Sequence, residues 1–234
     1  MAFNNELKLN LPNSFPAREF EGFMRAARAI LLPSKAEAWR EFAGASNLIG
    51  WRFRSSYEDM MSYLESWRTY GADVKFEELY LRQRALFGMF VSGVSCIEST
   101  CYAAYALASH PSLLGLPFGD AEQKKCSPAK LRTAILSHSA APALAAALKS
   151  LIDAREWRLW VDLRNRMTHR SNLPRIIRGA VGALPPPAKA LQFAATSSTP
   201  AFEADEGDLD ALFVWLSQSL GELLDGGRLL AERP

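Results

Sequence analysis

Cysteine is scarce in this sequence, and the common cofactor signatures are missing. The chain of 234 residues has only three cysteines, Cys96, Cys101 and Cys126, an odd number without CxxC spacing. A disulfide framework and a zinc site are therefore unsupported, and we expect reduced thiols in an intracellular protein. Neither GxGxxG nor GxxxxGK[ST] occurs, and no His, Asp and Glu cluster has metal spacing, so the sequence predicts no cofactor and no metal.

The chain also lacks the pattern of a secretory or transit peptide and has one long apolar run. Its first residues show no basic flank followed by an apolar stretch. The run from Ala85 to Ser109 carries a single charge, Glu98, and is long enough to span a bilayer. An ionised glutamate at its centre and many small polar residues favour a helix buried in a soluble bundle instead. We therefore expect no membrane association and a cytoplasmic location.

Positive charge is not in general excess, because the net charge is only +2. This balance argues against a generally basic protein that coats nucleic acid. The stretch from Arg155 to Arg178 is an exception, with seven arginines and His169 against only Glu156 and Asp162. Such a patch is either a track for the RNA backbone or simply a solvated face.

The apolar residues recur mostly at intervals of three and four, which predicts an all-α helical bundle built on two long antiparallel helices. With 49% hydrophobic residues, the chain is long enough to bury the core of one domain, over residues 34–234. Residues 1–33 read as an N-terminal arm with a short helix at 18–32. The long helices are expected after a capping-box pattern at Ser34–Glu37, continuing to Gly71 or broken near Gly50, and at 76–109.

Shorter helices are predicted in the second half of the chain. Ser127 and Pro128 form a helix start, and the expected segments are 128–137, 142–152 and 153–170. Residues 175–206 change to Gly, Ala, Pro and short β-prone pieces, which indicates a small hairpin or an irregular excursion. A last helix is expected at 208–225, stopped by Gly226-Gly227.

The helix expected at 153–170 carries the clearest chemical pattern. A helical wheel puts Trp157, Trp160, Val161, Met167 and Thr168 on one side, with Arg164 in the middle of that apolar arc. A guanidinium there must snorkel, pair with a buried carboxylate or face an interface that admits an anion. Asn165 and His169 are four residues apart on the adjacent flank, so all three side chains can border one cleft.

These residues carry a family resemblance. The segment Leu163-Arg164-Asn165-Arg166-Met167-Thr168-His169 resembles the Arg-Asn-x-x-x-His signature of HEPN domains, which are small helical bundles. The stretch from Phe90 to Tyr102 is similar to the second long helix of that family, which commonly has a polar or acidic residue within an apolar run. The resemblance covers about residues 35–173. It implies a homodimer through the motif helix and, as in many HEPN domains, a metal-independent ribonuclease.

The resemblance implies a candidate catalytic set of Arg164, Asn165, His169 and Glu98. His169 would act as general acid or base, Arg164 would hold the scissile phosphate, and Asn165 would orient the phosphate or the imidazole. Glu98 would position Arg164 and offset its charge. The expected substrate is single-stranded or loop RNA, cleaved to a 2′,3′-cyclic phosphate. Further RNA contacts are expected from Arg158, Arg166, Arg170 and Arg175.

One branch of the family consists of toxins paired with an antitoxin, and it has a tyrosine two residues after the histidine. Ser171 stands at that position here, so regulation through that tyrosine is not expected. A toxin or defence role, and an antitoxin or regulatory partner, follow only from family habit.

Two other interpretations stay open. The chain could be a HEPN-like domain without catalysis, acting as a dimeric scaffold or as an RNA- or nucleotide-binding module. It could also be an unrelated helical protein in which Arg164 and His169 are structural. Glu98 is also interpreted as a buried partner that fixes the bundle. Trp157 and Trp160 are interpreted as core or dimer-interface residues and not as base-stacking platforms.

Overall fold

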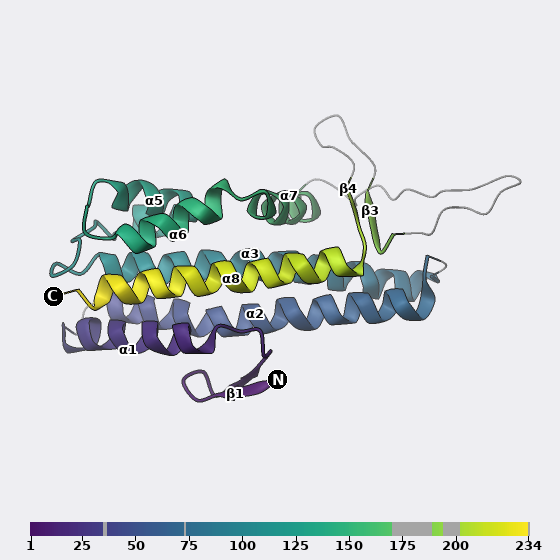
Figure 1. Cartoon of the computed structure of the whole chain (residues 1–234), viewed down its shortest axis with the longest axis horizontal. Coiled ribbons are helices and arrows are strands. Elements are labelled where there is room, and N and C mark those ends of the chain that lie inside the picture. The colour runs from purple at the N-terminus through teal and green to yellow at the C-terminus, as the bar shows by residue number, and fades with distance from the viewer. Residues whose placement is uncertain (35–36, 73, 170–188, 194–201, 234) are drawn as a thin grey trace, which may run out of the picture.

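A hairpin of two long helices, α2 (Glu37–Tyr70) and α3 (Phe76–Ala108), is the framework of the fold. The structure is a computed structural model, and it describes residues 1–34, 37–72, 74–169, 189–193 and 202–233. In Figure 1 the two helices run antiparallel along the whole length of the molecule. The apolar positions of α2 recur every three or four residues, and Phe42, Ile49 and Phe53 are fully buried.

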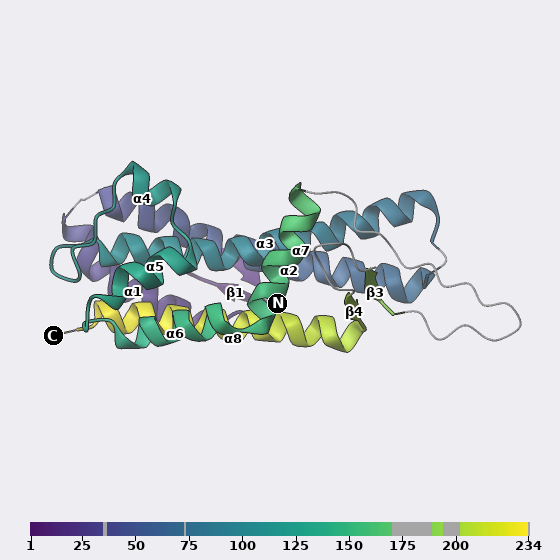
Figure 2. The same ribbon diagram turned by 90° about the horizontal axis from the view of Figure 1, so that it is seen from above.

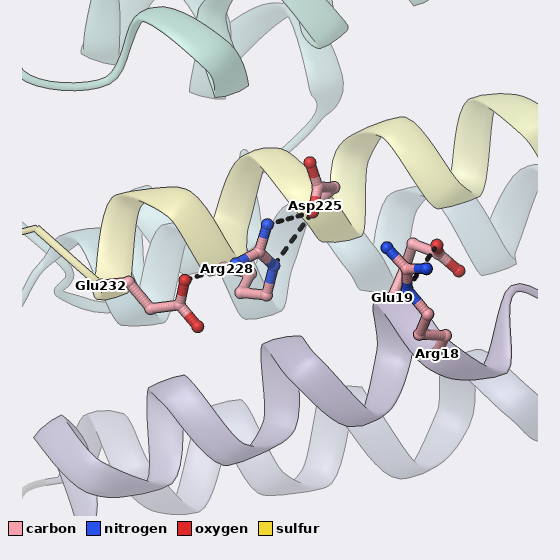
Figure 3. Close-up of polar contacts among 5 residues, drawn as sticks. All are labelled: Arg18, Glu19, Asp225, Arg228 and Glu232. Carbon is pink, nitrogen blue, oxygen red and sulfur yellow. Dashed lines mark hydrogen bonds and ion pairs between the residues drawn. The ribbon is translucent and has the colours of Figure 1, made fainter.

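Helices α1 (Ala17–Ser34) and α8 (Glu206–Ala231) run side by side and pack on the hairpin (Figures 1 and 3). Arg228 of α8 donates to the Asp225 carboxylate at 2.7 Å and also pairs with Glu232, as Figure 3 shows. Its side chain lies against Gly22 of α1, where a Cβ atom would come within 2.8 Å of Arg228 Cδ. Residues from the two ends of the described chain therefore share one seam.

The segment expected as an N-terminal arm, residues 1–33, contributes to the core of this bundle. Phe20, Phe23 and Leu31 of α1 have no exposed surface. Before α1, a short hairpin of β1 (Ala2–Asn4) and β2 (Leu9–Leu11) pairs antiparallel, with Ala2 opposite Leu11. This hairpin was not predicted from the sequence.

Four shorter helices follow α3: α4 (Asp120–Lys124), α5 (Pro128–Leu136), α6 (Pro142–Asp153) and α7 (Arg155–His169). The last of them, α7, is the helix that carries the motif. The α5 start has the predicted form, because Ser127 Oγ accepts from the Lys130 amide at 3.3 Å and Pro128 opens the helix. In Figure 2, α6 runs along α8 while α7 crosses α3 steeply. The crossing places the motif helix over the middle of the apolar run of α3.

The predicted all-α class with a small β excursion before the last helix is confirmed. The excursion contains β3 (Leu191–Phe193) and β4 (Phe202–Ala204), which pair antiparallel next to the start of α8. Residues 175–188 and 194–201 of this segment lie outside the described part of the chain. Helix α2 is continuous through Gly50. A Cβ at Gly50 would collide with Leu7 Cδ1, so glycine leaves room for the Leu7 side chain that covers the helix there.

The predicted end of the last helix at Gly226-Gly227 is wrong. Helix α8 continues to Ala231, and both glycines lie inside it. A Cβ at Gly226 would come within 2.8 Å of the Leu144 backbone of α6, and one at Gly227 within 2.6 Å of the Phe23 ring of α1. These glycines serve close helix packing and not a helix stop.

The apolar helix α3 is the one helix among the described residues that is long and apolar enough to cross a membrane. However, 61% of its apolar window is buried inside the protein. Such burial is consistent with the core helix of a soluble protein, as the sequence analysis expected for the run around Glu98.

Candidate functional site

The position of α7 on α3 is set by a tryptophan that fits against a glycine. Trp160 is fully buried, and its ring makes an edge contact with Phe90 at a centroid distance of 4.8 Å. A Cβ at Gly93 would come within 2.5 Å of the Trp160 ring, so only glycine permits this approach. Trp157 is also buried, which confirms that both tryptophans are core residues and not exposed stacking platforms. The residues that follow are thereby held over α3.

The ion pair expected between Arg164 and Glu98 is present. Arg164 Nη2 donates to Glu98 Oε1 at 3.1 Å, across 66 positions of sequence. The side chains keep 24% and 36% of their surface exposed, so the pair sits at the edge of the core and within reach of solvent. Arg164 Nε is buried and has no hydrogen-bond partner among the described residues. Glu98 therefore fixes one end of the guanidinium while the side chain remains partly open.

The rest of the motif occupies the last turns of α7. Asn165 is half-buried, and Thr168 Oγ1 donates back to the Arg164 carbonyl at 2.9 Å. The helix reaches His169 by its backbone, but the His169 side chain lies outside the described part of the structure. The position of the imidazole relative to Arg164 therefore stays a prediction.

The arginines expected to contact RNA fall into two groups. Arg158 is exposed and donates to the Asp153 carbonyl at 2.8 Å, and Arg166 is half-buried in the same helix. Arg170 and Arg175 lie outside the described residues. The described part of the patch therefore places Arg158 and Arg166 on the helix that carries Arg164.

A pocket of about 370 Å³ adjoins the ion pair and shares Glu98 with it. Its wall is formed by α2, α3 and the segment after α4. Gly44, Ala45 and Leu48 form an uncharged side, and the polar lining residues are Glu41, Arg52, Glu98, Ser99, Tyr102 and Cys126. Among these polar residues only Glu98 was a candidate site residue from the sequence. The others carried no signal, because they look like ordinary polar positions of two amphipathic helices.

Hydrogen bonds to neighbouring groups occupy part of each charged side chain in the pocket. Tyr102 donates its hydroxyl to Glu41 Oε2 at 2.7 Å. Arg52 Nη1 donates to the Ser95 carbonyl at 2.9 Å and to Ser99 Oγ. The carboxylates of Glu41 and Glu98 thus each keep one oxygen without a partner among the described residues. The nitrogens of Arg52 other than Nη1 are also without a partner there. The pocket therefore offers both acceptors and donors to a ligand.

The cysteines are free thiols in the described structure. Burial, followed by the negative charge of Glu98, raises the pKa of Cys126 to about 12. Burial raises the pKa of Cys96 to about 12 as well. The pocket thiol is therefore neutral near physiological pH, and it is a poor nucleophile and metal ligand there. The described residues contain no group of three His, Cys, Asp or Glu side chains arranged to hold a metal ion.

Comparison with known proteins adds no further evidence. No protein-family model, no curated protein and no solved structure matches the chain. The function proposed below therefore rests on the residues of the candidate site and their geometry.

Proposed function

We propose that this protein is a metal-independent endoribonuclease of the HEPN type that acts as a homodimer. The observation that supports the proposal is the ion pair between Arg164 and Glu98. The two segments that resemble the family, 163–169 and 90–102, are distant in sequence and meet through this pair. The carboxylate that Arg164 needs within its apolar arc thus comes from the second segment that resembles the family.

The proposed reaction needs a proton acceptor, a proton donor and a cation at the phosphate. The ribose 2′-oxygen attacks phosphorus, the bond from phosphorus to O5′ breaks, and a 2′,3′-cyclic phosphate and a 5′-hydroxyl result. One imidazole of His169 takes the 2′-hydroxyl proton, and the second copy of His169 in the dimer gives a proton to O5′. Arg164 offsets the negative charge that grows on the phosphate oxygens.

Glu98 and Asn165 act on the geometry of this reaction. Glu98 holds the Arg164 guanidinium at 3.1 Å, which fixes its direction before RNA binds. Asn165 lies next to Arg164 on α7 and orients the phosphate or the imidazole. Arg158 and Arg166 on the same helix attract the RNA backbone. A two-fold axis near α7 would bring two copies of each side chain into one groove.

The test is cleavage of total RNA and of a labelled single-stranded oligonucleotide by purified protein in excess EDTA. Wild type should cleave, and the new ends should be a 5′-hydroxyl that accepts kinase labelling and a 3′ end that resists ligation. His169→Ala should lose at least a hundredfold in rate, because general acid–base catalysis contributes about 10²–10⁴-fold.

His138→Ala is the matched control, because His138 follows α5 and lies outside the motif helix. It should cleave like wild type. Both variants should melt at the wild-type temperature and keep its oligomeric state. Absence of cleavage by wild type, or equal cleavage by wild type and His169→Ala, would contradict the proposal.

One observation favours a second candidate, a dimeric module that binds RNA or a nucleotide without cleaving it. The Glu98 carboxylate already offsets the charge of Arg164, as in a pair that only stabilises the bundle. This candidate predicts that RNA binds and stays intact, and that Arg164→Ala weakens binding. The same RNA assay with a binding measurement separates the two candidates.

A further inference from the structure

The pocket next to the ion pair has a lining suited to one nucleobase. Its volume of about 370 Å³ lies in the lower part of the range for small-ligand sites, about 300–1,000 Å³. Glu98 belongs both to the pocket and to the Arg164 pair, so a group bound there lies next to whatever Arg164 holds. If Arg164 holds a phosphate, the adjoining group in RNA is the ribose with its base.

The free hydrogen-bonding atoms of the pocket give it a defined polarity. Glu41 and Glu98 each present a carboxylate oxygen that accepts from no described residue. Arg52 presents nitrogens beyond Nη1, the atom that binds Ser95 and Ser99. The Cys126 thiol is neutral, and therefore adds no charge. The charged groups of the pocket thus combine two acceptors with one donor.

The glycine in the pocket wall is a second observation that fits a ligand. Gly44 lies in the interior of α2, where glycine weakens a helix. A Cβ at Gly44 would meet nothing within 4 Å, so no neighbouring described residue requires a glycine there. Its lack of a side chain instead leaves open space at the wall of the pocket.

We propose that this pocket binds the guanine base beside the scissile phosphate, an inference that rests on the proposed ribonuclease function. Guanine presents two adjacent donors, N1–H and the N2 amine, beside the O6 acceptor. Glu41 and Glu98 accept from the two donors, and Arg52 donates to O6. Uracil offers a single donor between two carbonyls, and cytosine and adenine offer only an exocyclic amine. Guanine alone matches two carboxylates with one arginine.

The experiment maps the cuts made in a labelled single-stranded RNA in which each base occurs beside each other base. The measured quantity is the cleavage rate beside guanine divided by the mean rate beside the other three bases. Wild type should favour guanine, and Glu41→Gln should lower this ratio roughly tenfold, the size expected for one good base contact. The glutamine still accepts from Tyr102 through its amide oxygen, so the pocket wall keeps its hydrogen bond.

Two further variants separate the pocket from general effects of charge and folding. Glu65→Gln removes one negative charge from an exposed position of the same helix and should keep the wild-type ratio. Gly44→Trp adds a large side chain to the wall of the pocket, where a Cβ has open space, and should lower the ratio like Glu41→Gln. Thermal melting of all three variants shows whether the fold is kept.

The outcomes are distinguishable. Cleavage without base preference, preference for another base, or a guanine preference unchanged in both Glu41→Gln and Gly44→Trp overturns the pocket inference and leaves the ribonuclease proposal in place. Absence of cleavage at every position overturns the ribonuclease proposal and the inference with it. A guanine preference that falls in both pocket variants and stays in Glu65→Gln supports the inference.

Discussion

Glu98 is the residue on which most of the functional argument depends. It interrupts the apolar run of α3, where a charged side chain is costly unless it is paired. The pairing with Arg164 at 3.1 Å offsets that cost, and the remaining exposure leaves the carboxylate in contact with the pocket. One side chain therefore joins the two parts of the candidate site.

We expect Glu98→Gln to act on the position of Arg164 more than on RNA affinity. Loss of the carboxylate loosens the guanidinium, and small misplacements of groups near the reacting atoms are costly, so kcat should fall roughly tenfold to a hundredfold. On an oligonucleotide without guanine, where Glu98 makes no contact to the base, KM should stay the same or decrease, because the net positive charge of the RNA-facing side rises. Steady-state kinetics on one oligonucleotide measure both constants.

A purely structural role for Glu98 predicts something else. In that case Glu98→Gln would lower the melting temperature and reduce the amount of active protein, while kcat per folded molecule and KM would stay unchanged. Glu65→Gln, an exposed site on α2, controls for the loss of one charge and should match wild type in kcat, KM and melting temperature.

At the scale of elements, periodicity predicted much of the helical arrangement, and glycine was the main source of error. The long helices, the Ser127 start of α5 and the motif helix follow from apolar spacing and capping residues. Gly226-Gly227 reads as a helix stop in the sequence, because glycine commonly ends helices. Only the approach of α6 and α1 shows why glycine is needed inside α8, and that information is tertiary.

We expect Gly226→Ala to destabilise the protein although alanine favours helices. The added Cβ would press on the Leu144 backbone at 2.8 Å, and backbone cannot rotate away as a side chain can. Overpacking of this kind costs about 1–3 kcal/mol. Gly221→Ala on the same helix is the control, because its Cβ would meet Pro16 at 3.4 Å, an ordinary contact.

Urea denaturation measures the free energy of unfolding of both variants. Gly221→Ala should match wild type or gain about 0.5–1 kcal/mol from the better helix former. Equal stability of Gly226→Ala and Gly221→Ala would contradict the packing explanation for α8.

For the molecule as a whole, the all-α class and the ion pair between Arg164 and Glu98 could be predicted from the sequence, but the pocket could not. The pair was predictable because an arginine within an apolar arc needs a carboxylate, and α3 offers a single one in its apolar run. The pocket depends on which residues of α2 and α3 lie opposite each other and on where Cys126 packs. Polar residues such as Glu41 and Arg52 give no sign in the sequence that they line the same pocket.

The buried thiols predict that the whole protein loses stability in alkali. The pKa values of Cys96 and Cys126 are raised to about 12 from 9.0, and burial also raises that of Cys101. Below pH 9 these thiols are neutral in both states and stability is unaffected. Above pH 9 they ionise in the unfolded chain only, so the free energy of unfolding should fall from pH 9 towards 12.

Urea denaturation at pH 8, 9 and 10 measures this effect. A pH roughly one unit above the pKa of the thiols in the unfolded chain is enough to show it. A variant with Cys96→Ala, Cys101→Ala and Cys126→Ala together should lose less stability between pH 8 and 10 than wild type. An identical decline in both proteins would assign the alkaline loss to groups other than the thiols.

The seam between α1 and α8 has a consequence for the newly made chain. Phe20 and Phe23 of α1 are fully buried in the finished protein, and α8, which covers α1, begins at Glu206. The ribosome must therefore add most of the remaining sequence before α1 can bury its apolar face. During this delay of many seconds, at about 5–20 residues per second, the nascent α1 exposes an apolar segment to which a chaperone at the exit tunnel can bind.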